Sequence, residues 1–109
     1  MNERNARLAA NEAVFRAGNE LIGRRVVGVG PRRTAYLCEC GDARCFERVE
    51  LTDEEYERVR SHPARFLVAA GHEDLTAGEA VVEELGEWTI VEKRGAEREI
   101  VERSNPRAS

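Results

Sequence analysis

All three cysteines of the sequence, Cys38, Cys40 and Cys45, lie within eight consecutive positions. On an extended segment, side chains two positions apart point to the same side of the chain, so Cys38 and Cys40 can direct their sulfurs to one point. Gly41-Asp42 is a dipeptide typical of a turn, and a chain reversal there would bring Cys45 back to the same point. Thiolates favour Zn²⁺ over Mg²⁺ or Ca²⁺. The spacing therefore predicts three ligands of a zinc site.

A closed tetrahedral zinc site needs a fourth ligand, and the sequence offers two histidines. His72 follows a predicted strand that could lie beside the cysteine turn. His62 stands next to Pro63 at the end of a predicted helix, where we expect it to face solvent. We favour His72 as the fourth ligand, with Glu73 or Asp74 orienting its ring by accepting a hydrogen bond.

Two other states of the cysteines stay open from the sequence alone. A C-x-C-x4-C pattern is weaker evidence for zinc than two C-x-x-C pairs. One disulfide with an odd thiol is a possible state, although the short loop would strain it. Three plain reduced thiols are the other, and their clustering beside a turn argues against ordinary burial.

The composition is that of one small domain with a thin core. Of 109 residues, 41% are hydrophobic and 35% are charged, so a metal staple would add stability that the core cannot supply. No apolar run approaches the roughly 18–20 residues that span a bilayer, and the first residues are charged, unlike a secretory signal. We therefore expect no membrane partner and a cytoplasmic location, where thiols stay reduced.

Charge is spread unevenly along the chain. Residues 1–48 hold nine Arg against six acids, a net +3, whereas residues 73–102 hold ten acids against three bases, a net −7. Residues 23–33 are expected to form a flexible Arg/Gly-rich connector. Its basic residues are Arg24, Arg25, Arg32 and Arg33. The connector lacks the Lys of a phosphate-binding loop, and the acidic second half argues against nucleic acid as a partner.

Residues 1–22 are predicted to form an N-terminal helix. Leu8, Phe15 and Ile22 recur every seven residues and, joined by Val14 and Leu21, make a narrow apolar stripe. The stripe can pack on the domain's own sheet, or it can form an interaction face for a second copy or another protein.

The cysteine turn is predicted to join two strands, Thr34–Cys38 and Arg48–Leu51. A central helix follows directly, since Thr52 and Glu55 have the spacing of a capping box. Pro63 should end this helix near residue 61.

The remaining segments complete a core over residues 34–95. Residues 65–70 read as a strand, and Gly86-Glu87 suits a two-residue hairpin turn before a strand at residues 88–93. A short helix over 79–85, ended by Gly86, is the alternative. Residues 96–109 are expected to be a frayed helix and a disordered tail. The predicted fold class is α+β: a long N-terminal helix, a small antiparallel sheet with a zinc-knuckle-like cysteine hairpin, and one capped central helix.

Four segments form a distinctive set: LCECGDARC (37–45), VELTDEEYERVR (49–60), RFLVAAGHE (65–73) and WTIVEK (88–93). Together with the opening NERNARLAANEAVFR, they resemble a family of short uncharacterised actinobacterial proteins that carry a CECGD-x-x-C motif and a GHE motif. The resemblance covers most of residues 2–95. It implies the same fold boundaries, and because that family has no assigned activity, it implies no function.

The function expected from these features is that of a small zinc-stapled regulatory or adaptor protein acting through protein–protein contacts. We expect no catalytic activity, because there is no Ser-His-Asp arrangement and the His-x-Glu and Pro-Cys-x-x-Cys order of deaminases is missing. A thiol-based redox or metal sensor is one alternative. A zinc protein that binds nucleic acid weakly is the other.

Overall fold

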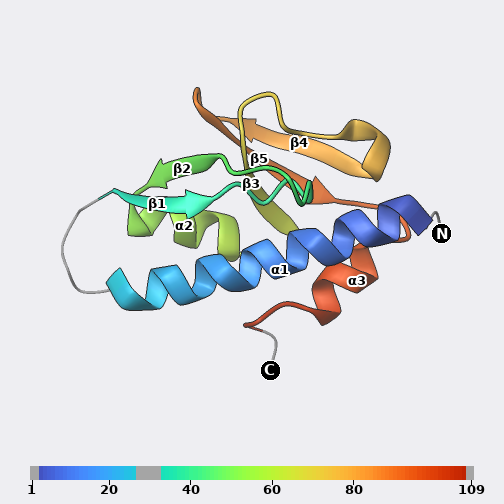
Figure 1. Cartoon of the computed structure of the whole chain (residues 1–109), viewed down its shortest axis with the longest axis horizontal. Coiled ribbons are helices and arrows are strands. Elements are labelled where there is room, and N and C mark those ends of the chain that lie inside the picture. Colours follow the sequence, from blue (N-terminus) through green and yellow to red (C-terminus); the bar gives the residue numbers. More distant parts are fainter. Residues whose placement is uncertain (1–2, 27–32, 108–109) are drawn as a thin grey trace.

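The computed structural model describes residues 3–26 and 33–107 and has an α+β fold (Figure 1). Its elements, in chain order, are α1 (Glu3–Val26), β1 (Thr34–Leu37), β2 (Arg48–Leu51), α2 (Asp53–Arg60), β3 (Arg65–Ala69), the 3-10 helix η1 (Leu75–Ala77), β4 (Glu79–Glu84), β5 (Trp88–Lys93) and α3 (Arg98–Arg103). The predicted fold class is confirmed. Of the helices that the structure describes, none has the length and apolar character to cross a membrane.

The strands form two antiparallel sheets rather than one. β1 pairs with β2, and the second sheet has the order β3-β5-β4. β5 is central, and all six of its residues are buried. The hairpin reading of its connection to β4 is right: Gly86 has φ +86°, and the Leu85 N–H donates to the Trp88 carbonyl over 2.9 Å. A Gly in the first turn position permits this positive φ without strain.

Helix α2 begins and ends where its local sequence predicts. The Thr52 hydroxyl accepts a hydrogen bond from the Glu55 N–H, and the Glu55 carboxylate accepts one from the Thr52 N–H. These two bonds satisfy backbone donors that the first helical turn leaves open. Ser61 caps the other end, two residues before Pro63.

Helix α1 is longer than predicted and is part of the core rather than a separate unit. It continues to Val26, past the expected end at residue 22, and packs against β1 and α3, as Figure 1 shows. Most of the expected connector, residues 27–32, lies outside the described residues, as do the side chains of Arg24 and Arg25. Arg33 is described, and it donates to the Glu50 carbonyl over 3.0 Å.

The buried face of α1 is polar, and its exposed face is apolar. The buried residues are Ala9, Glu12, Ala13, Arg16, Asn19 and Glu20. The exposed residues between positions 8 and 23 are Ala10, Val14, Ala17 and Leu21. The predicted interaction stripe of Leu8, Phe15 and Ile22 is half-buried, and Ile22 packs against the core. Val14 and Leu21, which join the predicted stripe, are exposed, so only that edge of the stripe faces solvent.

Two cationic side chains inside the fold have partners that come from distant segments. Arg16 is fully buried, lies 4.6 Å from the centre of the Phe66 ring and donates to the Pro63 carbonyl. Burial lowers the pKa of Arg16 to about 10. Lys93, the only lysine in the sequence, is also fully buried, with its Nζ 2.8 Å from Glu12 Oε1 and 3.4 Å from Glu79 Oε1.

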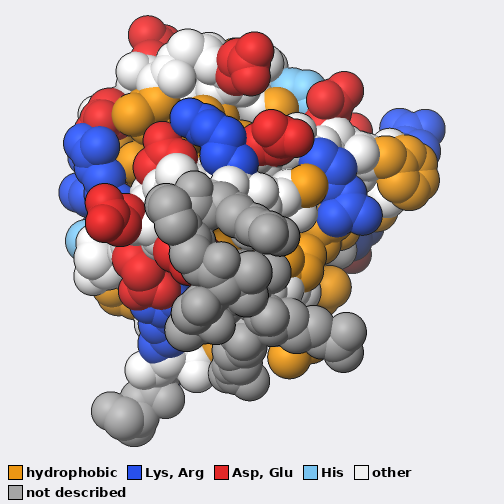
Figure 2. Space-filling model, turned by 90° about the vertical axis from the view of Figure 1, so that its left-hand side faces the viewer, with side chains coloured by type: hydrophobic (Ala, Val, Ile, Leu, Met, Phe, Trp, Pro, Cys, Tyr) orange, Lys and Arg blue, Asp and Glu red, His pale blue; other side chains and the backbone are white. Residues whose placement is uncertain are grey.

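The segment after α3 differs from the disordered tail that the sequence led us to expect. Asn105 accepts a hydrogen bond from Arg60, and Arg107 binds acidic residues of α1 and α2. Residues 108–109 lie outside the described part. Figure 2 views the end of the molecule where α1 finishes, and there acidic and basic side chains are interspersed. The charge asymmetry of the sequence therefore does not separate into two faces on this side.

Candidate metal centre

The cysteine segment is a tight loop between β1 and β2. The Cys38 N–H donates to the Glu47 carbonyl over 3.1 Å, and the Cys45 N–H donates to the Asp42 carbonyl over 3.0 Å. Gly41 turns the chain with φ +84°, and a side chain there would press on Glu12 and the Leu8 carbonyl of α1 at 3.0 Å. The loop thus needs glycine both for its turn and for its close approach to α1.

Glu39 fastens this loop to the second sheet. Its side chain alternates with those of Cys38 and Cys40 and is fully buried on the opposite side. The carboxylate accepts from the Leu67 N–H over 3.1 Å and from the Asn19 amide over 2.7 Å. Burial raises the pKa of Glu39 to about 7. The structural role of Glu39 was not predicted, although the alternation of side chains along an extended segment is a signal in the sequence that indicates it.

The structure brings the four predicted ligands together. One ligand atom each from Cys38, Cys40, Cys45 and His72 lies within 4.8 Å of all the others. His72 Nδ1 is 3.6 Å from Cys38 Sγ and 3.5 Å from Cys45 Sγ. Zn–S bonds of about 2.3 Å and a Zn–N bond of about 2.0–2.1 Å at tetrahedral angles place sulfur and nitrogen about 3.5 Å apart. The two sulfur–nitrogen distances therefore match those of a tetrahedral site, and all four ligand atoms are close enough to hold one metal ion.

Backbone N–H groups point at the sulfurs, which favours the thiolate form that binds metal. Hydrogen bonding with Cys40 and burial raise the pKa of Cys38, and the Ala69 N–H, which donates to Cys38 Sγ over 3.2 Å, offsets part of this rise. Hydrogen bonding with Cys38 is the main cause that lowers the pKa of Cys40 to about 5, and the Asp42 N–H contributes to it. Burial raises the pKa of Cys45, and a backbone N–H at Glu47 offsets part of this effect.

His72 reaches the cysteines because the chain turns sharply after β3. The His72 N–H donates to the Ala69 carbonyl over 2.9 Å, and Gly71 between them has φ +85°. The contacts of His62 are made with residues outside this centre. Its Nδ1 accepts from the Ala64 N–H over 3.1 Å, and its Nε2 lies 3.6 Å from Glu92. His62 is half-buried, so the expectation that it simply faces solvent is wrong.

Neither of the two residues expected to orient His72 is hydrogen-bonded to its ring in the described part of the structure. Asp74 accepts from the Thr76 N–H over 3.0 Å and pairs with Arg4 at 3.1 Å. One oxygen of Glu73 is buried and has no hydrogen-bond partner among the described residues. The structure thus shows no bond from either carboxylate to the imidazole of His72 within its described part.

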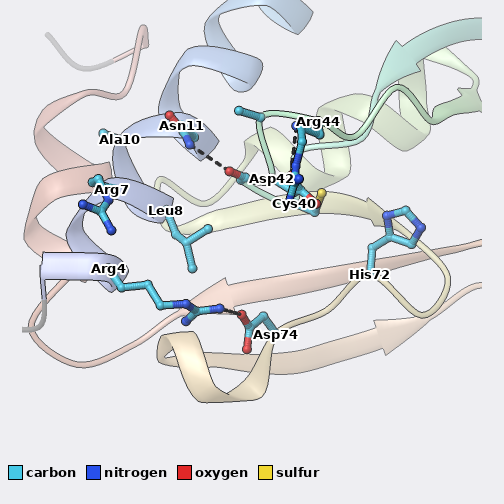
Figure 3. Close-up of a pocket in the computed structure, with 12 residues that line it drawn as sticks. Arg4, Arg7, Leu8, Ala10, Asn11, Cys40, Asp42, Arg44, His72 and Asp74 are labelled. Carbon is cyan, nitrogen blue, oxygen red and sulfur yellow. Dashed lines mark hydrogen bonds and ion pairs between the residues drawn. The ribbon is translucent and has the colours of Figure 1, made fainter.

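A surface pocket of about 650 Å³ borders the centre (Figure 3). One wall is the first half of α1, including Leu8, and the facing wall is the cysteine loop, which Asn11 holds by donating to the Gly41 carbonyl over 2.9 Å. Cys40 and His72 both line the pocket. Two of the four ligands are therefore open to small molecules such as chelators.

Comparison with protein-family models, with curated proteins and with solved structures finds no match for this chain. The chemistry of the centre is accordingly inferred from its own ligand geometry. The Cys3His cluster can hold a metal ion, and three sulfurs with one imidazole nitrogen form a donor set suited to a soft or borderline ion.

Proposed function

We propose that the protein binds one Zn²⁺ through Cys38, Cys40, Cys45 and His72, and that the ion is a structural staple. The observation that carries the proposal is the convergence of one ligand atom from each of these four residues within 4.8 Å, with His72 Nδ1 3.6 and 3.5 Å from the sulfurs of Cys38 and Cys45. Zn²⁺ is the ion that most often takes such a closed Cys3His set, whereas Mg²⁺ and Ca²⁺ require oxygen ligands.

The staple would join the two sheets of the fold. The cysteines lie on the loop between β1 and β2, and His72 follows β3 of the other sheet. Glu39 already ties the two sheets at this junction through its hydrogen bonds with the backbone of Leu67. A tetrahedral ion would add four bonds at the same junction, which is how a chain with a small core gains stability from metal.

The same geometry favours a non-catalytic role. Catalytic zinc keeps one coordination position for water or substrate, whereas four protein ligands fill a tetrahedron. The expected consequence is a site that holds its metal without turning over a substrate. A regulatory or adaptor role through protein contacts fits such a site, and the apolar outer face of α1 is the observation that favours it.

The outer face of α1 has the pattern of a self-complementary helix seam. Ala10, Val14, Ala17 and Leu21 alternate small and large residues at spacings of four, three and four. In an antiparallel pair of identical helices, Val14 would face Ala17 and Leu21 would face Ala10 of the second copy. Two-fold pairing of this kind is the commonest route to a homodimer.

Val14→Glu is expected to abolish self-association without unfolding the protein. The Val14 side chain is 67% exposed, and substitutions at such positions usually change stability by no more than about 0.5 kcal/mol. Sedimentation velocity over a concentration series measures the effect. Phe46→Glu is the matched control, because Phe46 is 87% exposed but lies on the cysteine loop. A wild-type protein that stays monomeric, or a dimer that both variants disrupt equally, would contradict this seam.

The ligand assignment is tested by comparing the two histidines. His72→Ala is expected to weaken zinc binding by orders of magnitude, because water replaces a protein ligand. His62→Ala is expected to leave zinc affinity unchanged, since His62 contacts Ala64 and Glu92 instead. Competition with a chromogenic chelator measures both affinities, with Cys45→Ser as the reference for a lost ligand. Loss of zinc in His62→Ala but not in His72→Ala would refute the assignment.

A further inference from the structure

A second pocket, of about 550 Å³, lies between the end of α1, β1 and α2, away from the metal centre. Its aromatic wall is formed by Tyr36 and Tyr56, whose rings stack in parallel with centroids 4.3 Å apart. Three acidic residues also line it: Glu20, Asp53 and Glu57. A pocket with one flat apolar wall and several carboxylates is suited to a flat cation.

The guanidinium of Arg107 lines this pocket and makes a complete set of directed contacts with two of its carboxylates. Its Nε and Nη2 donate to the two oxygens of Glu20, over 2.7 and 3.2 Å. Its Nη1 and Nη2 donate to the two oxygens of Glu57, both over 2.8 Å. All three nitrogens are used in two bidentate pairs, a geometry that guanidinium can satisfy and a lysine ammonium cannot.

The arginines that contact Glu57 and Glu20 lower the pKa values of both carboxyl groups. Hydrogen bonding from Arg107 is the main cause that lowers the pKa of Glu57. Burial alone would raise the pKa of Glu20, but hydrogen bonds from Arg107 and Arg60 lower it below its ordinary value. Asp53 makes no ion pair with any residue that the structure describes. The three acidic residues of the pocket therefore outnumber the two cations, Arg60 and Arg107, that pair with them.

The tyrosine wall of the pocket and Glu20 belong to the folded core, whereas Arg107 does not. Tyr36 and Tyr56 are almost fully buried, and Glu20 is held by the buried Arg60 over 2.7 Å. Arg107 lies four residues beyond the end of α3, on a segment whose other described side-chain anchor to the core is Asn105. The tyrosine wall and Glu20 are thus held independently of Arg107, and Arg107 can leave the pocket without removing any core residue.

We infer that this pocket is a recognition site for an arginine side chain, with two of its carboxylates bound in this chain by Arg107 and able to accept an arginine from a second polypeptide in its place. The ligand class is an extended peptide that contains arginine. The Glu57 side chain is 62% exposed, so the contact with Arg107 is partly solvated and each bond is individually weak. An incoming peptide that also reached Asp53 would gain a charge contact that Arg107 does not make.

The test removes the internal occupant and supplies it as a separate molecule. The probe is the acetylated and amidated peptide Ser-Asn-Pro-Arg-Ala-Ser, which has the sequence of residues 104–109. It is titrated into the zinc-loaded full chain carrying Arg107→Ala and followed by ¹H–¹⁵N NMR. We expect saturable shifts confined to the pocket around Glu20, Tyr36 and Glu57. Wild-type protein should bind at least about tenfold more weakly, because a tethered competitor acts at roughly millimolar effective concentration.

Two controls separate guanidinium recognition from general attraction to acids. The same peptide with Lys in place of Arg should bind at least about tenfold more weakly, since one ammonium cannot make both bidentate pairs. The double variant Arg107→Ala/Glu57→Gln should lose binding while its zinc content stays unchanged. If Arg107→Ala does not fold, Arg107→Lys is titrated instead. It keeps the positive charge, but its ammonium cannot make both bidentate pairs and should be displaced by the peptide's guanidinium.

Two results would overturn the inference. One is the absence of saturable binding to both Arg107→Ala and Arg107→Lys. The other is equal affinity for the Arg and Lys peptides, which would reduce the pocket to a diffuse acidic surface. Either result would leave the zinc proposal intact, because no metal ligand belongs to this pocket.

Discussion

Removing the metal ion is expected to cost the protein most of its cooperative fold. Structural Zn²⁺ in small domains binds with an apparent free energy of about 10–16 kcal/mol, whereas a whole domain is stable by only about 5–15 kcal/mol. Here the ion would join the β1–β2 loop to the chain beyond β3. Without the ion, the three sulfurs and the imidazole lie close together with no metal to bridge them. Even a loss of about 3 kcal/mol lowers the melting temperature of a domain this size by about 12 °C or more.

Elemental analysis of protein purified without added metal should find one zinc per chain. A chelator should then lower the melting temperature measured by circular dichroism, and added Zn²⁺ should restore it. Cys45→Ser is expected to reproduce the chelated state, because it removes one ligand and changes little else. A protein that melts at the same temperature with and without chelator, and whose three thiols titrate freely, would exclude a structural zinc site.

Replacing the buried lysine is expected to have the second largest effect. Lys93→Met would leave Glu12 and Glu79 facing each other inside the core without a cation. Removing one partner of a buried ionic group typically costs about 3–5 kcal/mol, because the remaining charge is neither hydrated nor paired. We therefore expect a largely unfolded protein at neutral pH, measured by urea denaturation followed through Trp88 fluorescence.

Glu12→Gln is the matched control, and it should be tolerated. Burial is the main cause that raises the pKa of Glu12 from its ordinary value of 4.5 to about 10, so the folded protein keeps a proton there that the unfolded chain has lost. As pH rises between these two values, the free energy of unfolding should fall by up to about 1.4 kcal/mol per pH unit from this group. Glutamine resembles the protonated acid and does not titrate.

The stability of Glu12→Gln relative to wild type should therefore increase with pH. Urea unfolding at about pH 6 and about pH 9 measures the difference, and comparison with wild type cancels the titration of other groups. Parallel pH profiles for the two proteins would show that Glu12 is ionised in the fold. Equal stability of Lys93→Met and Glu12→Gln would show that the buried lysine does not compensate the carboxylates.

Local signals in the sequence predicted the elements well. The Thr52–Glu55 capping box and the Gly86-Glu87 turn depend on residues at most three positions apart, and both are present. The cysteine loop is similar, because alternation and a Gly-Asp turn are enough to bring its sulfurs together. His72 needed a further assumption, that the strand before it lies beside the loop.

The inward face of α1 could not be predicted in the same way. Periodicity arguments assume that the buried side of a helix is its apolar side. In α1 the buried side carries Glu12, Arg16 and Asn19, whose partners Lys93, Pro63 and Leu37 are distant in sequence. Long-range pairing of this kind leaves no pattern within the helix itself. The same reason hid Arg107, whose carboxylate partners lie 50 and 87 positions away.

The burial of Lys93 also affects how the protein can be modified chemically. An acylating reagent, or an enzyme that transfers acetyl groups or ubiquitin to lysine, needs access to an uncharged Nζ atom at the surface. Lys93 is the only lysine in the sequence, and in the folded chain its amine is fully enclosed beside Glu12 and Glu79. Lysine-directed modification is therefore restricted to molecules that have opened. The fraction of chains acylated at Lys93, read by mass spectrometry, reports how often the core is exposed.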